Sequence, residues 1–302
     1  MKIEELEKLL KDFKKNLVFN KNLKNKSWFN IGGKAKVFFK AENLDELIRF
    51  LKKIDNKEKI FVLGAGSNTL ISDKFFDGIV LQLAKDFSNI SLLNENIIIS
   101  GSAVLDRSLS NFAMMNNISG FEYLSGIPGT VGGAIKMNAG CFGKEIRLNL
   151  LSVQAIDRIG NIKTIYAKDI IFDYRANDLS EDLIFLSASF KGKKSNHKEI
   201  KKEIDRIILE KKNSQPSRIK TCGSTFKNPL KETNKKVWEL INDSVPENLA
   251  YGDACISKKH KNFFINRGNA SFTDMSKLID HVSNAVFDKY GIRLEKEIKI
   301  LK

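Results

Sequence analysis

Residues 119–143 constrain the fold more than any other part of the sequence. The segment reads SGFEYLSGIPGTVGGAIKMNAGCFG and contains seven glycines among small and apolar residues. Glycine is costly inside helices and strands because it loses more conformational freedom on folding than any other residue. We therefore predict irregular backbone here instead of a regular element. Bare main chain in such quantity is useful where another group must approach the backbone closely.

Residues 125–140, the richest part of this segment, suit a large flat cofactor with a charged middle. Exposed amide groups can bind a pyrophosphate, and neighbouring apolar side chains can contact ring systems. The alternative is a buried glycine-rich crossover without any ligand. The candidate cofactor-binding residues of this stretch are Gly126, Pro128, Gly129, Thr130, Gly132, Gly133 and Asn138.

A second glycine-containing turn, LGAGSNTLISD, follows a predicted strand at residues 63–73. Successive amide groups in such a turn can bind phosphate oxygens. It is not the dinucleotide fingerprint, because Thr69 stands at the third glycine position and no helical pattern follows. A tight strand connection without a ligand is an equally good interpretation. The candidate cofactor-binding residues here are Gly64, Ala65, Gly66, Ser67 and Asn68.

The remaining chain mixes helices and strands without strict alternation, which favours an α+β fold. A length of 302 residues is enough for two or three compact units, and we place the main boundary within a charged helix at 196–213. A further helix begins after Asn43. The Asn43 side chain caps this helix, and the Glu46 side chain reaches back to the backbone N–H of Asn43. The other predicted helices cover residues 3–17, 104–117, 235–243 and 273–289. The predicted strands cover residues 60–63, 79–83, 97–100, 151–157, 162–166, 183–190 and 292–301.

Composition excludes several classes of protein. The net charge is +15, but lysines are interleaved with acidic residues along the whole chain, which is typical of a solvated surface. The second interpretation, with less weight, is that the net positive charge attracts a polyanionic substrate. No apolar run is long enough to cross a bilayer and the first residues lack a signal-peptide pattern, so we expect a cytoplasmic protein. No metal site or disulfide framework is expected, because the cysteines and histidines are single and scattered: Cys141, Cys222, Cys255, His197, His260 and His281.

These segments resemble the UDP-N-acetylenolpyruvoylglucosamine reductase family, known as MurB. The matching strings follow the family's order: FNIGGKA (29–35), LGAGSNTL with Asp73, GFEYLSGIPGTVGGAIKMNAG (120–140), DYR (173–175), QPSRIKTCGSTFKNP (215–229), ISKKHKNFFIN (256–266) and LEKEIKIL (294–301). Two stretches depart from the family pattern, NKSWFN before the first string and WELINDSVPENLAYGDA after residue 237. By the resemblance, the first lies at the flavin entrance and the second at the edge of the substrate domain, and neither removes a catalytic group.

The resemblance implies a two-lobed FAD-binding domain of the p-cresol methylhydroxylase type plus a smaller α+β substrate-binding domain. The domains expected are an N-terminal helix and lead-in (1–27), the FAD-binding domain (28–195, with lobes at about 28–85 and 86–195), the substrate-binding domain (196–290) and a C-terminal strand returning to the active site (291–302). The 183–190 strand runs directly into the 196–213 helix. This implies the family's compact form, which lacks an extra substrate-covering loop.

The activity implied is the NADPH-dependent, FAD-mediated reduction of UDP-N-acetylglucosamine enolpyruvate to UDP-N-acetylmuramate in peptidoglycan precursor synthesis. Three residues carry over as catalytic. Arg175 would hold the substrate carboxylate, because a guanidinium binds two oxygens and keeps its charge. Ser224 would deliver a proton to carbon, and Glu297 would orient the carboxylate. Strand alternation puts Glu295 and Glu297 on one face, so only the motif selects Glu297.

The resemblance also implies substrate-binding roles, and the partners expected are the UDP-sugar and NADPH. No nucleic acid partner and no membrane insertion are expected, and the protein should be a monomer. Two alternatives stay open: an FAD-dependent alcohol or sugar oxidase of the same fold, and a basic nucleic-acid-binding protein. The candidate substrate-binding residues are Tyr174, Lys212, Lys227 and Asn228.

Overall fold

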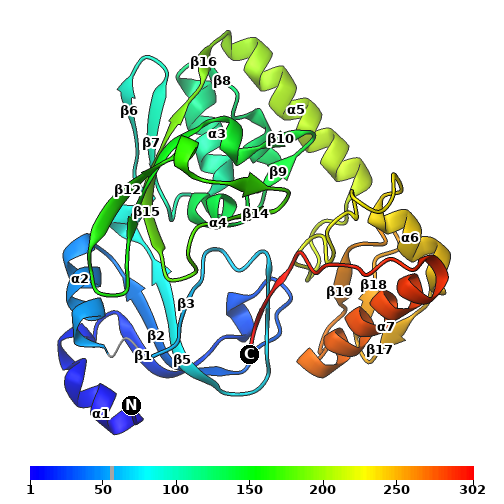
Figure 1. Cartoon of the computed structure of the whole chain (residues 1–302), viewed down its shortest axis with the longest axis horizontal. Coiled ribbons are helices and arrows are strands. Elements are labelled where there is room, and N and C mark those ends of the chain that lie inside the picture. Colours follow the sequence, from blue (N-terminus) through cyan, green and yellow to red (C-terminus); the bar gives the residue numbers. More distant parts are fainter. Residues whose placement is uncertain (55–57) are drawn as a thin grey trace. The chain divides into compact units, whose positions relative to one another are not determined.

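The computed structural model describes residues 1–54 and 58–302 (Figure 1). Contacts between residues divide the chain into two compact units, each built from three separate stretches. Unit 1 comprises Met1–Asn20, Lys36–Ala65 and Asp77–Glu210. Unit 2 comprises Lys21–Ala35, Gly66–Phe76 and Lys211–Lys302. Two short stretches from the first quarter of the chain therefore fold with the C-terminal third.

The first sheet of unit 1 has the strand order β1-β2-β5-β3. These strands are β1 (Leu17–Asn22), β2 (Lys34–Ala41), β3 (Ile60–Val62) and β5 (Phe76–Leu83), with β3 parallel to β5. Helices α1 (Ile3–Leu9) and α2 (Leu44–Lys53) share a buried apolar core with it. Three buried rings join them: Phe13 meets Phe39 and Phe50 edge-on, and Phe39 stacks on Phe50 with ring centroids 3.9 Å apart.

The predicted helix at residues 3–17 was too long. The α-helix ends at Leu9, a short 3-10 turn (Lys11–Phe13) follows, and Leu17 already begins β1. The predicted cap of α2 is confirmed, since Asn43 Oδ1 accepts a hydrogen bond from Glu46 N–H at 2.8 Å. The Glu46 carboxylate was expected to accept a hydrogen bond from the N–H of Asn43. It accepts instead from the N–H of Glu42, one residue earlier in the chain.

The second sheet of unit 1 is antiparallel, with the order β12-β11-β15-β7-β6. Its strands are β6 (Ile90–Asn94), β7 (Ile97–Gly101), β11 (Leu150–Ile156), β12 (Ile162–Tyr166) and β15 (Ile184–Lys191). Helices α3 (Asp106–Met115) and α4 (Val131–Lys136) share a buried apolar core with this sheet. Helix α5 (His197–Ser214) adds Ile207 to the same core.

Three small two-stranded pairings complete the described part of unit 1. Two are hairpins, β9 (Gly140–Cys141) with β10 (Lys144–Glu145) and β13 (Phe172–Asp173) with β14 (Ala176–Asn177). The third joins strands that are distant in the sequence, β8 (Ile118–Ser119) and β16 (Lys193–Lys194). Short 3-10 turns occur in this unit at Lys85–Ser88, Glu122–Gly126, Ile146–Leu148 and Ala167–Asp169, and another at Lys24–Lys26 belongs to unit 2. The prediction of fully irregular backbone at 119–143 was wrong in one respect: α4 forms there, with Gly132 and Gly133 inside it, because its Val131, Ala134 and Ile135 are buried in the core.

Unit 2 is a smaller α+β assembly. A three-stranded sheet contains β17 (Ala250–Tyr251), β18 (Ala254–Ile256) and β19 (Phe264–Asn266), and helices α6 (Val237–Ser244) and α7 (Phe272–Tyr290) pack in the same core. The strand β4 (Thr69–Ile71) pairs in parallel with β20 (Lys299–Leu301). The predicted strand at 292–301 was therefore too long, and Glu295 and Glu297 lie in the extended, irregular segment before β20.

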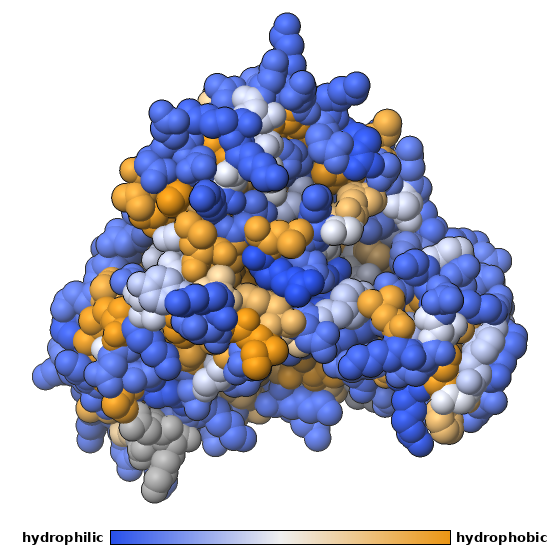
Figure 2. Space-filling model, turned by 45° about the horizontal axis from the view of Figure 1, so that its top comes forward, coloured by the Kyte–Doolittle hydropathy of each residue, from blue (hydrophilic) through white to orange (hydrophobic). Residues whose placement is uncertain are grey.

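The surface of the protein is mostly hydrophilic, as expected from lysines interleaved with acidic residues along the chain. Figure 2 shows hydrophilic residues over most of the visible face, with hydrophobic groups among them. Within the described ranges, no helix has the length and hydropathy needed to span a membrane. The same ranges contain no group of three or more His, Cys, Asp or Glu side chains that could hold a metal ion.

One charged side chain is completely buried in the core of unit 1. Asp106, the first residue of α3, is 0% exposed, and neither carboxylate oxygen has a hydrogen-bond partner in the described part of the chain. The hydroxyl of Tyr123 is also buried, and it has no partner among the described residues. Burial raises the pKa of the Asp106 carboxyl well above its ordinary value, because the charged form loses its hydration. The carboxyl is thus held in its neutral form in the folded protein over a wider pH range than in the unfolded chain.

We expect Asp106→Asn to change the pH dependence of stability. In the wild type, the contribution of neutral Asp106 to the free energy of unfolding is complete at pH values below the pKa that this carboxyl has in the unfolded chain. It is lost as the pH rises towards the higher pKa that the carboxyl has in the folded protein. The variant cannot ionise, so its stability relative to the wild type should rise by up to about 1.4 kcal/mol per pH unit above pH ~4. Thermal unfolding of both proteins at several pH values measures this. A difference in stability that does not vary with pH would contradict the prediction.

Candidate functional site

The two predicted glycine-rich segments meet in unit 1. A Cβ atom placed on Gly64 would lie 2.6 Å from Thr130 Oγ1, so these residues are in direct contact. The same hydroxyl caps α4 by accepting a hydrogen bond from Gly133 N–H at 3.4 Å. Sequence reasoning treated the two segments separately, and the structure brings Gly64 of one against Thr130 of the other. A side chain at position 64 would push into the cap of α4.

Residues 129–132 lie along the loop that connects β7 to α3. The amides of Val131 and Gly132 donate to the carbonyls of Val104 and Ser102, and the Asp106 amide donates to the Gly129 carbonyl. Gly132 is needed for this approach, because a Cβ there would lie 3.0 Å from the Ser102 Cβ. In the described chain, four amides at this junction donate no hydrogen bond to the protein: those of Gly64, Ala65, Gly129 and Thr130.

This set of donors fits the diphosphate of a dinucleotide. Clustered backbone amides beside a helix N-terminus favour anionic oxygens, and bare glycines allow such a group to come close. Partly buried apolar side chains flank the same segment, including Ile127 and Met137, which suits an adjoining ring system. The residues present in unit 1 are therefore compatible with FAD.

The remaining residues of the LGAGSN turn belong to unit 2. The Gly66 carbonyl accepts from Trp28 N–H, and Asn68 Nδ2 donates to the Glu297 carbonyl at 3.1 Å. Lys299 N–H donates to the Asn68 carbonyl at 2.9 Å. The structure thus brings a predicted cofactor-binding residue, Asn68, against a predicted catalytic residue, Glu297. Ser67 directly precedes Asn68 in the chain and is half-buried.

Cys222 lies beneath this turn and is 2% exposed. Its Sγ atom is 3.5 Å from the Thr69 carbonyl, 3.7 Å from the Gly66 carbonyl and 3.8 Å from Ser27 Oγ. Burial raises the pKa of the Cys222 thiol to about 11. A buried thiol with a raised pKa is a poor nucleophile, which is typical of a cysteine that packs a turn.

Two of the three predicted catalytic residues come together in unit 2. Ser224 is bridged to Phe263 on one side, and the next residue, Thr225, accepts a hydrogen bond on its carbonyl from Glu297 N–H at 2.8 Å. Lys227 N–H donates to the Glu295 carbonyl, which continues the pairing of the two segments. Ser224 and Glu297 are half-buried, so both remain accessible from solvent.

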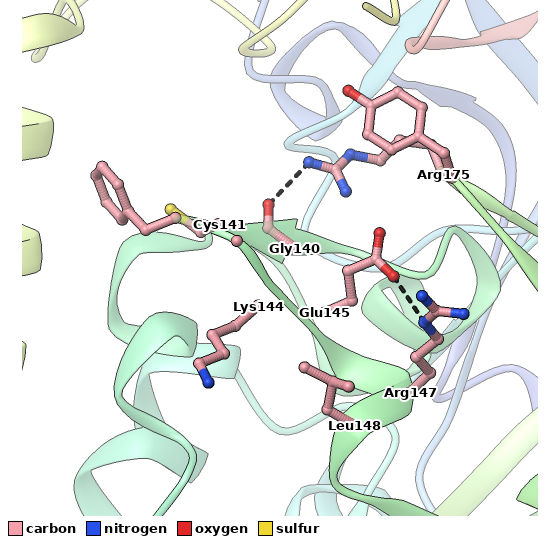
Figure 3. A pocket seen from close by; sticks show the side chains of 10 residues that line it. Gly140, Cys141, Lys144, Glu145, Arg147, Leu148 and Arg175 are labelled. Carbon is pink, nitrogen blue, oxygen red and sulfur yellow. Dashed lines mark hydrogen bonds and ion pairs between the residues drawn. The ribbon is translucent and has the colours of Figure 1, made fainter. Parts of the chain in front are cut away.

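Arg175, the third predicted catalytic residue, belongs to unit 1. It occupies the two-residue turn of the β13–β14 hairpin with φ +56°, a left-handed conformation that is uncommon for a side chain of this size. Its Nη2 donates to the Gly140 carbonyl at 2.9 Å, and its guanidinium lies 4.9 Å from the ring centre of Tyr174. Arg175 and Tyr174 line a cavity of about 340 Å³ together with residues 140–145, 147 and 148 (Figure 3).

The predicted substrate-binding residues take different positions. Tyr174 lies in the cavity with Arg175. In unit 2, Lys227 Nζ pairs with Glu295 Oε1 at 2.6 Å, and Asn228 Oδ1 accepts from Val237 N–H at the start of α6. Lys212 is exposed on the last turn of α5. Lys212, Lys227 and Asn228 therefore all belong to unit 2. The side chains of Lys227 and Asn228 already bind protein groups.

Sequence reasoning missed the polar residues around the Arg175 cavity. Lys144, Glu145 and Arg147 line it, and Glu145 Oε2 pairs with Arg147 Nε at 2.8 Å. The sequence feature that could have indicated this cavity is Gly140, the last residue of the predicted glycine-rich segment 125–140. A Cβ at that position would lie 2.4 Å from the Lys144 carbonyl and 3.2 Å from Arg175 Nη1, so glycine is required where these groups converge.

The fold and the site define the class of protein. An FAD binding domain model matches residues 35–166, a range that contains the Gly64–Thr130 junction. A second model, for the C-terminal domain of UDP-N-acetylenolpyruvoylglucosamine reductase, matches residues 215–301 and contains Ser224 and Glu297. The protein is an FAD-dependent oxidoreductase. It belongs to the UDP-N-acetylenolpyruvoylglucosamine reductase (MurB) family.

Individual relatives match along nearly the whole chain. A UDP-N-acetylenolpyruvoylglucosamine reductase from Pelagibacter ubique is 58% identical over 302 residues, which is 100% of both chains. One from Rickettsia bellii is 42% identical over 278 residues, or 92% of this chain and 91% of that protein. The crystal structure of MurB from Thermus caldophilus has a TM-score of 0.81 at 30% identity and covers 95% of this chain and 98% of that one. The family and fold class expected from the sequence are confirmed.

Proposed function

We propose that this chain reduces UDP-N-acetylglucosamine enolpyruvate to UDP-N-acetylmuramate with NADPH as the hydride donor, as a step of peptidoglycan precursor synthesis. The observation that carries the proposal is membership of the reductase family along the full chain, together with matched FAD-binding and C-terminal domains. The protein would work as a cytoplasmic monomer. The proposed domain limits are those expected from the sequence: 28–195 for FAD, 196–290 for the substrate, and 291–302 as the returning strand.

FAD would be held by the glycine-rich residues of both segments and, when bound, would supply the hydride chemistry. The amides of Gly64, Ala65, Gly129 and Thr130, which have no acceptor in the described chain, suit its diphosphate. The other proposed cofactor-binding residues lie in the same two segments: Gly66, Ser67, Asn68, Gly126, Pro128, Gly132 and Gly133.

Three side chains would carry the substrate chemistry. Arg175 would bind the carboxylate of the enolpyruvyl group, where negative charge accumulates when hydride adds to the double bond, and its fixed charge would stabilise that state. Ser224 would protonate the neighbouring carbon, because a hydroxyl is a weak acid small enough to fit beside a bound substrate. Glu297 would orient the substrate carboxylate. Tyr174, Lys212, Lys227 and Asn228 would bind the remainder of the substrate.

The test is a two-step anaerobic titration of the purified protein. Its visible absorbance should show a flavin band, NADPH should bleach it, and UDP-N-acetylglucosamine enolpyruvate should then restore it. UDP-N-acetylglucosamine without the enolpyruvyl group is the matched control and should leave the flavin reduced. A reduced flavin that the enolpyruvyl compound does not reoxidise would overturn the proposal. Colour that remains attached after acid precipitation would favour the alternative oxidase instead.

A further inference from the structure

The backbone position of Arg175 requires support from outside its own hairpin. A non-glycine residue in the left-handed region is strained by roughly 1–2 kcal/mol, and Arg175 has φ +56° in a two-residue turn. A long side chain on such a turn would otherwise sample many orientations. The groups that fix the turn therefore decide where the guanidinium points.

Asn138 makes that connection. Its Nδ2 group donates to the carbonyl of Asp173 at 2.9 Å, in the hairpin that carries Arg175, and to Glu145 Oε2 at 3.0 Å. Asn138 is 0% exposed and has φ +44°, so it is held by the surrounding core. Hydrogen bonds made inside a protein, away from water, hold geometry more firmly than exposed ones.

Glu145 completes the arrangement on the other side. Its Oε2 accepts from both Asn138 and Arg147, and its side chain is 20% exposed. Figure 3 shows the Glu145 carboxylate between the guanidinium groups of Arg175 and Arg147. Both Glu145 Cγ and Arg175 Nη1 border Gly140, since a Cβ there would lie 2.9 Å from the first atom and 3.2 Å from the second. The Glu145 carboxylate thus fixes the side-chain amide of Asn138. It also lies beside the Arg175 guanidinium, whose hairpin Asn138 holds.

We propose that Asn138 and Glu145 are positioning residues for Arg175. Asn138 links the Arg175 hairpin to the β9–β10 hairpin, and Glu145 orients the Asn138 amide so that both of its N–H groups are used. The inference rests on the proposed role of Arg175 in binding the substrate carboxylate. It also assigns to the side-chain N–H groups of Asn138 a task other than direct contact with FAD, because both already have protein partners.

Three variants test the link. Asn138→Asp removes both N–H donors while keeping a residue type that tolerates positive φ. Glu145→Ala removes the acceptor, and Glu145→Gln keeps an acceptor oxygen and serves as the conservative control. We expect the first two to raise the Kd for UDP-N-acetylglucosamine enolpyruvate and to slow flavin reoxidation by it about tenfold to hundredfold, the penalty of a small misplacement. Glu145→Gln should stay close to the wild type.

Two readouts separate positioning from flavin binding. FAD affinity and the rate of flavin reduction by NADPH should change less than about twofold in all three variants, and in an Arg175→Ala background Asn138→Asp should cause no further loss. Reduced FAD affinity, or an equal loss in the Arg175→Ala background, would overturn the inference.

A structural measurement remains decisive even if the proposed substrate is wrong. The NMR signal of the Arg175 Nε–H group, assigned by its loss in Arg175→Lys, should shift in Asn138→Asp and in Glu145→Ala but not in Glu145→Gln. An unshifted signal in the first two variants would contradict positioning. Failure of the proposed function, in contrast, would show as a wild-type flavin that the enolpyruvyl compound does not reoxidise.

Discussion

Ser224→Ala is expected to slow the reduction of UDP-N-acetylglucosamine enolpyruvate by about 10²–10⁴-fold, the usual contribution of a positioned proton donor. Reduction of the flavin by NADPH should continue at nearly the wild-type rate, because that half of the cycle needs no proton on carbon. The hydroxyl is half-buried in the strand-like segment that pairs with the segment of Glu297, so its removal leaves backbone pairing intact. Stopped-flow absorbance, with each half-reaction measured separately, gives both rates.

Ser217→Ala is the matched control for this prediction, because Ser217 is an exposed serine in the same QPSRIKTCGSTFKNP string and makes the same chemical change. Both half-reactions should be unaffected. Ser224→Cys tests the proton donor more finely, since a thiol can replace the hydroxyl as a weak acid and should recover part of the lost rate. An equal slowing of both half-reactions in Ser224→Ala would show that the serine supports the fold or the flavin and does not deliver the proton.

Much of the fold followed from local patterns in the sequence. Apolar periodicity located α2, α3, α5, α6 and α7 to within a few residues, and the cap at Asn43 formed as expected. Such features depend on contacts between near neighbours in the chain, which periodicity and capping residues describe directly.

The errors have a common physical origin in tertiary contacts. The apolar pattern from Ile3 continued beyond the true end of α1 at Leu9, because Leu10, Phe13 and Leu17 are buried against the sheet in other backbone conformations. Alternation at 292–301 predicted one strand, yet only Lys299–Leu301 finds a partner in β4. Helix α4 forms despite two glycines, since burial of its apolar residues outweighs their low helix propensity.

Site residues were predictable as types, while their supporting contacts were not. The motif strings selected Arg175, Ser224 and Glu297, and these assignments remain predictions. Nothing local in the sequence indicated that Asn138 and Glu145 would meet the hairpin of Arg175, because that junction joins three separate segments of unit 1. Likewise, the turn at 63–73 reads as one motif, but its residues divide between the two units at Ala65 and Gly66.

Gly66→Ala is expected to destabilise unit 2 by about 4 kcal/mol or more, which is beyond the effect of most single substitutions. Gly66 has φ +69°, and a Cβ there would lie 1.9 Å from the carbonyl oxygen of Lys26. That oxygen belongs to backbone, so it cannot rotate away as a flexible side chain would. Relief would require moving the segment of Trp28, whose N–H donates to the Gly66 carbonyl, and the carbonyls around Cys222.

Both tryptophans of the chain, Trp28 and Trp238, lie in unit 2, so tryptophan fluorescence during urea unfolding of the apoprotein follows that unit alone. Gly291→Ala is the matched control. Gly291 has φ +71°, almost the same backbone conformation, but apart from its immediate chain neighbours no atom of the described chain lies within 4 Å of a Cβ there. It should cost only the left-handed strain of alanine, about 1–2 kcal/mol. The excess loss in Gly66→Ala isolates the collision with Lys26, and equal losses in the two variants would mean that the turn relaxes without cost.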